Sequence, residues 1–434
     1  MLVAIVKEQK TGEARVAASP ETVSKFVSLG FDVVVETGAG FLSHVTDEAF
    51  IASGATVVKT AKEALAKADI VVKIWRPLTK NDPEKIDEVS LLKKGAHVVS
   101  LMDPYDSGAY FEMLAKKGVN AYALEWVPRI TRAQTMDVLS SQSNLAGYKS
   151  VLDATEHYGR AFPMMMTAAG TIPPAKVMIM GAGVAGLQAI ATAKRLGAVV
   201  CATDVRMAAK EQVESLGGSF VMVDDEEARN AETSGGYAKE MSDAYKKKQA
   251  ILIEETLVKQ DIAITTALIP GRPAPTLITK EMVAKMRPGS IIVDMAAARG
   301  GNCELSKPDQ IVTTENGVTI IAHTNIPSRL ASDASRLYAK NILNFVSLLW
   351  DSENKKLAVN FDDEIIKAAC LTQSGKVVHE SYAVKKAAPK AKKAPAKKTV
   401  KKAPAKKAAP KKATSKKAAP KKTTAKKTAA KKKL

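Results

Sequence analysis

The sequence predicts an α/β protein of two doubly wound, Rossmann-like domains joined by long helices, followed by a disordered Lys-rich C-terminal tail. Three observations support this prediction. Short runs of apolar and β-branched residues alternate with helical patterns in both halves of the chain, which is typical of parallel βαβ units. A loop with Pro173 and Pro174 separates the two series of runs. Acidic residues are absent after residue 384, where the lysine-rich tail begins.

The strongly basic net charge comes from this tail. The chain of 434 residues carries a formal net charge of +20, but residues 385–434 hold 22 Lys and no Arg, Asp or Glu. Residues 1–384 therefore contain 43 basic against 45 acidic residues, a net charge of −2. The body is a near-neutral globular protein whose length suggests two or three domains. Its charge does not mark it as a nucleic-acid binder.

Neither the cysteines nor the apolar runs indicate a metal site, a disulfide framework or a membrane span. Cys201, Cys303 and Cys370 are scattered, with no CxxC and no His at ligand spacing, which fits a reducing cytosol. The N-terminus is expected to form a strand and not a signal peptide. The uncharged stretch 177–193 is at the lower length limit for a transmembrane helix, and its glycines have a better explanation below. We expect a cytoplasmic protein without a transmembrane helix.

The first series contains six expected strands, at residues 2–7, 31–36, 55–59, 69–75, 97–102 and 121–126. A helix is expected between the first two strands. Ser19 can cap it and Pro20 suits its first position. Glu21 favours the positive end of the helix dipole, and Gly30 can stop the helix. The order strand, helix, strand predicts a parallel βαβ unit.

The second series follows a long helix expected from Met136 through residues 155–160. Its strands are expected at residues 176–180, 198–204, 219–224, 261–267, 290–296 and 318–324. An apolar-periodic helix at residues 333–350 ends the body, and we expect it to return to the first domain. The predicted domains are residues 1–140 with 328–384, the nucleotide-binding residues 141–327, and the tail at 385–434.

A polar stretch at residues 226–249 interrupts the second series and contains Gly235 and Gly236. One interpretation is a surface excursion followed by a solvated helix. The other is a mobile lid, in which the glycines form a hinge and Tyr237 and Met241 cover a ligand, because long loops in compact domains are often functional. The sequence leaves both interpretations open.

Gly181, Gly183 and Gly186 form a GxGxxG motif. A predicted strand precedes it, and a helix and a further strand follow, which is the context that dinucleotide binding requires. The first glycine permits a tight turn, the second lets the backbone approach a pyrophosphate, and the third lets the helix pack on the strand. The pyrophosphate would lie at the helix N-terminus, where free N–H groups and the helix dipole favour an anion. The alternative is a glycine-rich turn without a ligand.

Asp204 ends the next strand, 18 residues after Gly186. A carboxylate there can accept from the 2′-hydroxyl of the adenosine ribose and would face a 2′-phosphate unfavourably, which favours NAD over NADP. Arg206, two residues further, could in principle pair with that phosphate. Residues 265–268 and 294–296 end neighbouring strands and border the same crevice. The predicted cofactor-binding residues here are Gly181, Ala182, Gly183, Val184, Ala185, Gly186, Asp204, Val205, Ala267 and Leu268.

Residues 128–142, PRITRAQTMDVLSSQ, concentrate polar side chains at the join between the domains. Asp137 is a good N-cap for the long helix. A cap does not account for Arg129, Gln134 and Ser140, which offer the donors and acceptors that a nicotinamide carboxamide and its ribose need. No motif marks a catalytic base among the five histidines.

Several motifs occur together, in order, in a known family. The segments RITRAQTMDVLSSQSNLAGYKSV, GAGVAGLQAIATAKRLGA, ATDVR, AETSGGYAKEM, DIAITTALIPGRPAP and HTNIPSR resemble the alpha subunit of proton-translocating NAD(P) transhydrogenase, its soluble NAD(H)-binding component. The resemblance covers nearly all of residues 1–384. Alanine dehydrogenase is a wider relative.

The resemblance implies that Arg129, Gln134, Asp137 and Ser140 hold the nicotinamide and its ribose, with Gln134 and Asp137 serving catalysis. It also implies that Tyr237 belongs to a mobile loop over the nucleotide. The family component is a homodimer that binds NADH and passes a hydride directly to NADP(H) on a partner subunit, coupled to proton movement through membrane subunits. Direct transfer needs no general acid or base, only two nicotinamides in a water-poor site. A peripheral position on the cytoplasmic face of the inner membrane follows from the same resemblance.

The main alternative is an NAD-dependent, alanine-type amino-acid dehydrogenase. In that family an Arg and a Lys hold the substrate carboxylate, and Arg15 and Lys73 match these two residues. Its catalytic His would fall near Met102, where this chain has none, and His97 is not at the matching place. Because deamination needs a proton acceptor, the sequence favours the transhydrogenase.

The tail resembles the basic tails of histone H1-like proteins in composition, and the transhydrogenase pattern gives it no role. Clustered lysines bind nucleic-acid phosphates by counterion release. They also bind anionic membrane surfaces, at about 1 kcal/mol per Lys near the surface. Attachment to partner subunits and a solvated tail without a partner are the other hypotheses.

Overall fold

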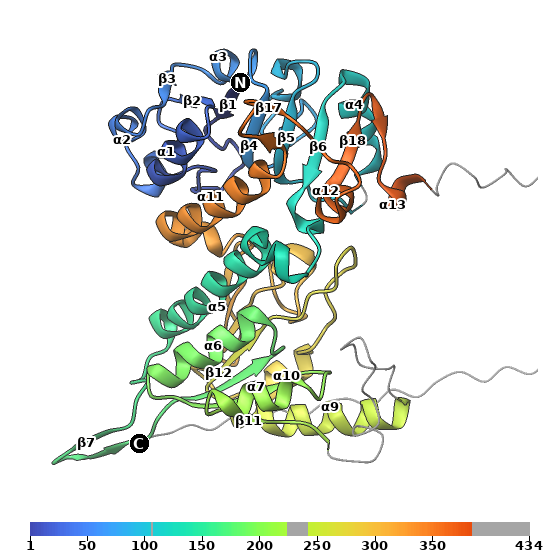
Figure 1. The fold of residues 1–434 in the computed structure, drawn as a ribbon. Coiled ribbons are helices and arrows are strands. Elements are labelled where there is room, and N and C mark those ends of the chain that lie inside the picture. Colours follow the sequence, from blue (N-terminus) through green and yellow to red (C-terminus); the bar gives the residue numbers. More distant parts are fainter. Residues whose placement is uncertain (106, 224–241, 384–434) are drawn as a thin grey trace, which may run out of the picture. The chain divides into compact units, whose positions relative to one another are not determined.

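The computed structural model describes residues 1–105, 107–223 and 242–383, and these form two mainly parallel sheets with flanking helices (Figure 1). The predicted α/β, Rossmann-like fold class is confirmed for these residues. The Lys-rich tail, Gly235, Gly236, Tyr237 and Met241 lie outside the described residues. Of the polar stretch 226–249, only the start of a helix from Asp243 is described, so the choice between surface excursion and lid stays open.

The first sheet has the strand order β19-β18-β6-β5-β4-β1-β2-β3. Because β1 pairs in parallel with both β2 and β4, the direction of winding reverses between β1 and β4. The last two strands are antiparallel additions at one edge. The bounds are β1 (Leu2–Ile5), β2 (Asp32–Glu36), β3 (Thr56–Val58), β4 (Ile70–Trp75), β5 (His97–Leu101), β6 (Asn120–Ala123), β18 (Cys370–Gln373) and β19 (Lys376–Val377).

The helix predicted between β1 and β2 is present as α1 (Pro20–Ser28), with the predicted residues at its two ends. Ser19 caps α1 through its side chain, Pro20 is its first residue, and Gly30 follows it with a φ of +94°. That left-handed conformation favours glycine, which ends the helix. The other helical segments around this sheet are α2 (Asp47–Ala52), α3 (Ala61–Leu65), α4 (Gly108–Lys117), α12 (Glu364–Ala369), α13 (Glu380–Ala383), η1 (Phe41–Ser43), η2 (Val89–Leu91), η3 (Leu124–Trp126) and η4 (Thr131–Met136).

Helix α11 (Ala331–Ser347) packs on the first sheet although it follows the second sheet in sequence. Its apolar face shares a core with β1 and β4 and includes Tyr338, Ile342 and Phe345. The Tyr338 hydroxyl also donates to the Lys73 carbonyl at 3.0 Å. A small hairpin, β16 (Trp350–Asp351) with β17 (Lys356–Leu357), follows this helix. The exact domain boundaries stay a prediction.

The second sheet has the order β11-β10-β9-β12-β13-β15-β14, and all strands except β14 pair in parallel. Its strands are β9 (Lys176–Met180), β10 (Val199–Thr203), β11 (Ser219–Phe220), β12 (Ile262–Thr265), β13 (Ile291–Asp294), β14 (Ile311–Thr313) and β15 (Thr319–Ile321). Its helical segments are α5 (Val138–His157), α6 (Val184–Arg195), α7 (Ala209–Ser215), α9 (Asp243–Leu257), α10 (Lys280–Lys285), η5 (Ala297–Arg299) and η6 (Pro327–Leu330).

The structure differs from the sequence prediction in four places. The predicted strand 121–126 ends at Ala123, and Leu124–Trp126 form the 3-10 helix η3 instead. Of the predicted strand 219–224, the described residues 219–223 contribute only the two residues of β11, which form the edge of the sheet. The segment before Pro173 is a hairpin, β7 (Met165–Thr167) with β8 (Gly170–Ile172), where the sequence predicts a loop. Strands β14, β16, β17, β18 and β19 were not predicted, because they are short and pair antiparallel.

Helices α5 and α6 cross closely at Gly147. A Cβ at this position would lie 2.1 Å from the Ala185 carbonyl oxygen, so only glycine allows the approach. The crossing fixes α5, which Asp137 caps, against α6, which starts at the glycine motif. Among the residues that the structure describes, no helix combines the length and the apolar character needed to cross a membrane.

Candidate functional site

The glycine motif forms the turn between β9 and α6, as the sequence predicted. Gly181 has a φ of +109° and its N–H donates to the Thr203 carbonyl at 2.8 Å, which ties the turn to β10. A Cβ on Gly186 would lie 1.8 Å from the Gly181 carbonyl oxygen. Only glycine therefore permits α6 to start this close to the strand.

Gly183 differs from its neighbours because it faces open space. A Cβ built there meets nothing within 4 Å. Gly183 is the N-cap of α6, and it supplies no side chain to satisfy the first N–H groups of the helix. Unpaired N–H donors at the positive end of a helix dipole favour an anion. The space and the donors together fit a pyrophosphate.

Asp204 follows β10 at the same edge of the sheet. Its carboxylate accepts from the Ala182 N–H at 2.7 Å and from Arg206, whose Nε lies 2.9 Å away. Burial alone would raise the pKa of Asp204, but the hydrogen bonds from Arg206 and from the backbone lower it overall. The adjacent Val205 is exposed, and 73% of its surface faces solvent. An ionised acid beside an exposed apolar side chain suits a ribose and an adenine ring.

The loop after β12 completes this edge. Asn302, which is fully buried, accepts from the Ala267 N–H at 3.0 Å and donates to the Ala267 carbonyl at 2.9 Å. Asp294, also buried, accepts from the backbone N–H of Asn302 at 2.8 Å and so holds the Asn302 backbone in place. Leu268 is left exposed at this edge of the sheet. Asp294 and Ala267 were placed here by strand position; Asn302 was missed, since only its contacts reveal its role.

The polar segment before α5 divides into two groups. Asp137 caps α5 by accepting from the Ser140 N–H at 2.8 Å, and the Ser140 hydroxyl donates to the same carboxylate at 2.6 Å. The cap thus accounts for Ser140, for which the sequence alone offers no structural reason. Arg129 and Gln134 are exposed, and neither side chain has a hydrogen bond within the described residues. These two retain free donors and acceptors for a ligand.

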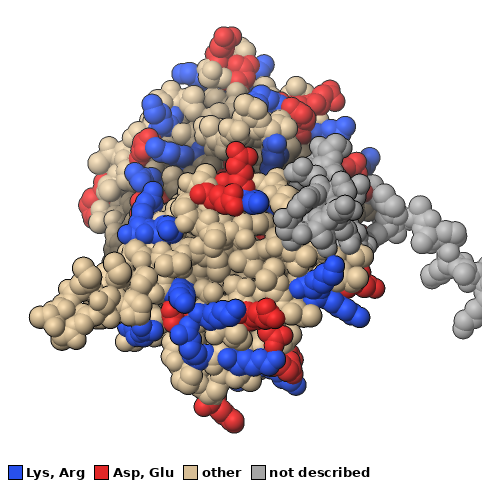
Figure 2. Space-filling model, turned by 90° about the horizontal axis from the view of Figure 1, so that it is seen from below, with Lys and Arg blue, Asp and Glu red and all other residues tan. Residues whose placement is uncertain are grey.

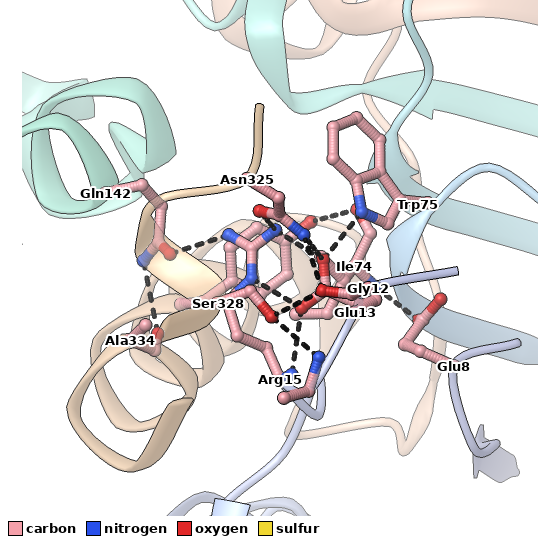
Figure 3. A network of polar contacts seen from close by, with 12 residues as sticks. Glu8, Gly12, Glu13, Arg15, Ile74, Trp75, Gln142, Asn325, Ser328 and Ala334 are labelled. Carbon is pink, nitrogen blue, oxygen red and sulfur yellow. Dashed lines mark hydrogen bonds and ion pairs between the residues drawn. The ribbon is translucent and has the colours of Figure 1, made fainter. Parts of the chain in front are cut away.

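Figure 3 shows Arg15 at the centre of a polar network. Its Nη2 lies 2.6 Å from Glu13 Oε2, and its Nη1 donates to Gln142 Oε1 on α5 at 2.8 Å. Trp75 Nε1 and Asn325 Nδ2 donate to Glu13 at 2.7 and 3.0 Å. Burial alone would raise the pKa of Glu13, but Arg15 and Asn325 lower it to about 2. The network joins the segment after β1 to α5 and to the segment before α11.

The chain matches two family models, which together span most of its described residues. The N-terminal domain model of alanine dehydrogenase/PNT matches residues 4–146, and the corresponding C-terminal domain model matches residues 150–380. The chain belongs to the alanine dehydrogenase/PNT family.

Within this family, similarity to known proteins favours the transhydrogenase branch. An NAD(P) transhydrogenase alpha subunit of Rhodospirillum rubrum is 57% identical over 87% of this chain and 98% of its own length. A crystal structure of transhydrogenase from Sinorhizobium meliloti superposes with a TM-score of 0.78 at 50% identity, covering 87% of this chain and all of that one. Alanine dehydrogenase of Methanococcus maripaludis is 30% identical over 88% of this chain and 96% of its own length. The resemblance to transhydrogenase alpha subunits is confirmed.

Arg15 and Lys73, which the resemblance matches to the substrate-binding cations of alanine dehydrogenase, form ion pairs with carboxylates of this chain. Arg15 is paired with Glu13, as described above. Lys73 Nζ lies 2.9 Å from Glu88 Oε1 and 3.3 Å from Glu8 Oε2, and all three side chains are buried. Burial alone would lower the pKa of Lys73, but both carboxylates raise it. Neither cation is free to hold a substrate carboxylate.

Neither Met102 nor His97 offers the proton acceptor that the amino-acid dehydrogenase alternative would need. Met102, near the corresponding place, is fully buried in the core of the first sheet. His97 Nδ1 lies 3.0 Å from the Tyr122 hydroxyl, and burial lowers the pKa of His97 to about 4. His97 is therefore a neutral, structural side chain.

Glu125 is expected to make the stability of the first domain depend on pH. It accepts from the N–H groups of Met102 and Asp103 at 2.8 and 2.7 Å, and burial raises its pKa to about 7 from an ordinary value of about 4.5. The folded state therefore holds this proton up to about pH 7, whereas the unfolded chain releases it near pH 4.5. We expect the contribution of Glu125 to the unfolding free energy to fall as pH rises through this window, by about 1 kcal/mol per pH unit, and then to level off.

Glu125→Gln keeps the acceptor oxygen and removes the titration. The measurement is urea unfolding of both proteins between pH 4.5 and pH 8, followed by tryptophan fluorescence. The variant should show a shallower net decline. Glu8, whose pKa burial also raises to about 7, adds to the decline, whereas His97, whose pKa burial lowers to about 4, opposes it below about pH 6.5. Parallel pH curves for variant and parent would contradict the assignment.

Proposed function

We propose that this chain is the NAD(H)-binding subunit of a proton-translocating NAD(P) transhydrogenase. The glycine turn carries the proposal, because Gly183 opens onto free space at the uncapped start of α6. Asp204, beside the turn, fits a ribose without a 2′-phosphate and so favours NAD(H) over NADP(H). The relatives named above as transhydrogenase alpha subunits support the same function.

The residues of this chain would bind and orient the nucleotide and would not transfer protons. A bound nicotinamide supplies the hydride, which passes directly to NADP on a partner subunit. Gln134 and Arg129 are exposed with free polar groups, so they can hold the carboxamide and the ribose hydroxyls. Asp137, held by Ser140 at the start of α5, can accept from the same hydroxyls. Orientation of this kind contributes much of the rate of a direct transfer.

The test is hydride transfer from NADH to an NADP analogue, with and without the NADP-binding component of a transhydrogenase. We expect turnover only when both proteins are present, and no NAD reduction with alanine. Gln134→Ala and Asp137→Asn should slow transfer by about tenfold to a hundredfold, because small misplacements of the ring are costly. Both should leave stability nearly unchanged, since Gln134 is exposed and Asn is also a good N-cap.

Gln310→Ala is the control, because Gln310 is an exposed glutamine beside the edge strand of the second sheet and lies outside the proposed site. It should transfer hydride at the parent rate. NAD reduction that depends on alanine alone would instead indicate an amino-acid dehydrogenase and would overturn the proposal.

The β7–β8 hairpin supports the homodimer that the family resemblance implies. The hairpin exposes Met165, Met166 and Ile172, and Met164 directly before it is exposed too; 77% of Met166 faces solvent. In Figure 2, a projection without charged side chains stands at the left edge, which is the side of the hairpin in Figure 1. Contiguous exposed apolar side chains often mark protein–protein contacts, and a second copy of this chain is the proposed partner.

The other proposed partners are the NADP-binding and membrane-spanning subunits, which would place the chain at the cytoplasmic face of the inner membrane. The Lys-rich tail is an independent candidate for attachment, since the family models end at residue 380. Its 22 Lys and absent acids fit an anionic membrane surface or, as the alternative, nucleic acid. Salt-dependent retention of residues 1–434 and 1–384 on anionic vesicles and on DNA separates these possibilities.

A further inference from the structure

Arg206 lies across the acid and the glycine turn of the candidate nucleotide site. Its Nε and Nη2 donate to the two oxygens of Asp204 at 2.9 and 3.1 Å. Nη2 also lies 3.4 Å from the Ala182 carbonyl oxygen within the turn. The guanidinium therefore occupies the place between the end of β10 and the turn, where a ribose would have to approach Asp204.

The hydrogen-bonding capacity of Asp204 is already used. Oδ1 accepts from the backbone N–H and the Nε of Arg206, both at 2.9 Å. Oδ2 accepts from the Ala182 N–H at 2.7 Å and from Arg206 Nη2 at 3.1 Å. An ionised carboxylate offers about four lone-pair positions. A ribose hydroxyl can therefore bind only if a side-chain donor of Arg206 leaves.

The burial of the two side chains shows which one can move. The Asp204 side chain is 7% exposed, whereas that of Arg206 is 40% exposed. The acid is held by the Ala182 N–H of the turn, so the more exposed guanidinium is the group that would have to move when a ribose binds. After that move it remains close to the ribose, where it can pair with a 2′-phosphate in a bidentate manner.

We propose that Arg206 is a specificity-determining residue of the adenosine subsite, which competes with the ribose for Asp204 and narrows the preference for NAD(H) over NADP(H). This inference rests on the proposed function, because it assumes that NAD(H) binds at the glycine turn. It has two consequences of opposite sign. Removing Arg206 should strengthen binding of nucleotides with a free 2′-hydroxyl and weaken binding of those with a 2′-phosphate.

The experiment is calorimetric titration of the full chain with NADH, NADPH, 5′-AMP and adenosine 2′,5′-bisphosphate. The last two probes report on the adenosine subsite alone. The variants are Arg206→Ala and Arg206→Lys. Arg195→Ala is the control, since Arg195 is an exposed cation in the last turn of α6, at the far end from the glycine motif. Circular dichroism checks that each variant is folded.

For Arg206→Ala we expect NADH and 5′-AMP to bind about two- to fivefold more tightly, the range that a partly exposed ion pair supports. The two 2′-phosphorylated probes should bind more weakly by a similar factor, so the ratio of the dissociation constants should change about tenfold. Arg206→Lys keeps the cation without the planar fork, so it should retain most of the 2′-phosphate binding. Arg195→Ala should match the parent protein with all four probes.

The outcomes distinguish this inference from the function on which it rests. If the parent protein binds neither NADH nor 5′-AMP, the proposed function fails, and the inference fails with it. If the parent binds both, but Arg206→Ala leaves the ratio unchanged or binds 5′-AMP more weakly, the inference alone is overturned. The second result would mean that Arg206 supports the adenosine directly and does not compete with it.

Discussion

Replacing Lys73 with methionine is expected to lower the unfolding free energy of the first domain by about 3–5 kcal/mol, the usual cost of breaking a buried ion pair from one side. Lys73 Nζ lies 2.9 Å from Glu88 and 3.3 Å from Glu8, and each of the three side chains is at most 2% exposed. Without the ammonium, two carboxylates would remain buried beside each other. One or both would have to be protonated or the core would have to open.

The three tryptophans of the chain make this effect measurable in one domain. Trp75, Trp126 and Trp350 all lie with the first sheet, in β4, η3 and β16. A chain with two sheets need not unfold in one transition. Because all three tryptophans lie with the first sheet, their fluorescence reports the unfolding of that domain. The measurement is the urea midpoint of the fluorescence transition at pH 8, where carboxylates resist protonation.

Two further variants control for the interpretation. Lys80→Met removes a lysine whose side chain is 80% exposed and should change the unfolding free energy by less than about 0.5 kcal/mol. The triple variant Lys73→Met, Glu8→Gln, Glu88→Gln removes all three charges and should recover most of the loss, because a neutral polar group costs less to bury than an unpaired charge. A single Lys73→Met variant as stable as the parent would show that the triad is dispensable.

The fold class followed from local patterns, since each βαβ unit is defined within a few tens of residues. The cap at Ser19, the stop at Gly30 and the turn at Gly181 are all short-range signals, and the structure contains each of them. Strand β18 has no such signal. It pairs with β6 across about 250 positions of sequence, and its Thr372 hydroxyl donates to the Val119 carbonyl at 2.8 Å. Only the completed sheet edge explains why this segment is extended.

In the candidate site, too, the sequence indicated the kind of site, whereas the contacts of individual side chains required the structure. The residue types at 129–140 indicated a polar ligand, but their spacing could not show that Ser140 belongs to the cap of α5. The sequence placed Arg206 two residues from Asp204 and left open whether it would meet a phosphate. The structure pairs its guanidinium with the acid itself. Side-chain direction after a strand depends on the neighbouring turn, so the sequence alone could not decide this.

Gly186→Ala is expected to weaken nucleotide binding severely, because the added methyl group would displace the glycine turn itself. The added Cβ would lie 1.8 Å from the Gly181 carbonyl oxygen and 3.4 Å from Ile179. The contact is with backbone, so either α6 or the turn must move. Overpacking of this kind costs about 1–3 kcal/mol and sometimes more. Losing two N–H bonds to a pyrophosphate would weaken NADH binding by about a hundredfold or more.

Gly183→Ala separates the structural glycines from the one that faces the ligand. Its Cβ meets nothing within 4 Å, and its backbone lies in the extended region, with φ −79° and ψ −168°. The thermal midpoint should therefore stay at the parent value. NADH binding should still weaken, by about tenfold, because the methyl group takes the space that a pyrophosphate needs.

Gly159→Ala is the matched control for both variants. Gly159 is an exposed glycine of the same domain whose added Cβ also meets nothing within 4 Å, and it lies away from the turn. Circular dichroism melting and NADH titration of the three proteins give the comparison. If Gly183→Ala and Gly159→Ala bind NADH equally well, the space before α6 does not receive the pyrophosphate. The open glycine would then be a feature of the turn alone, and the nucleotide would have to be sought elsewhere on this sheet edge.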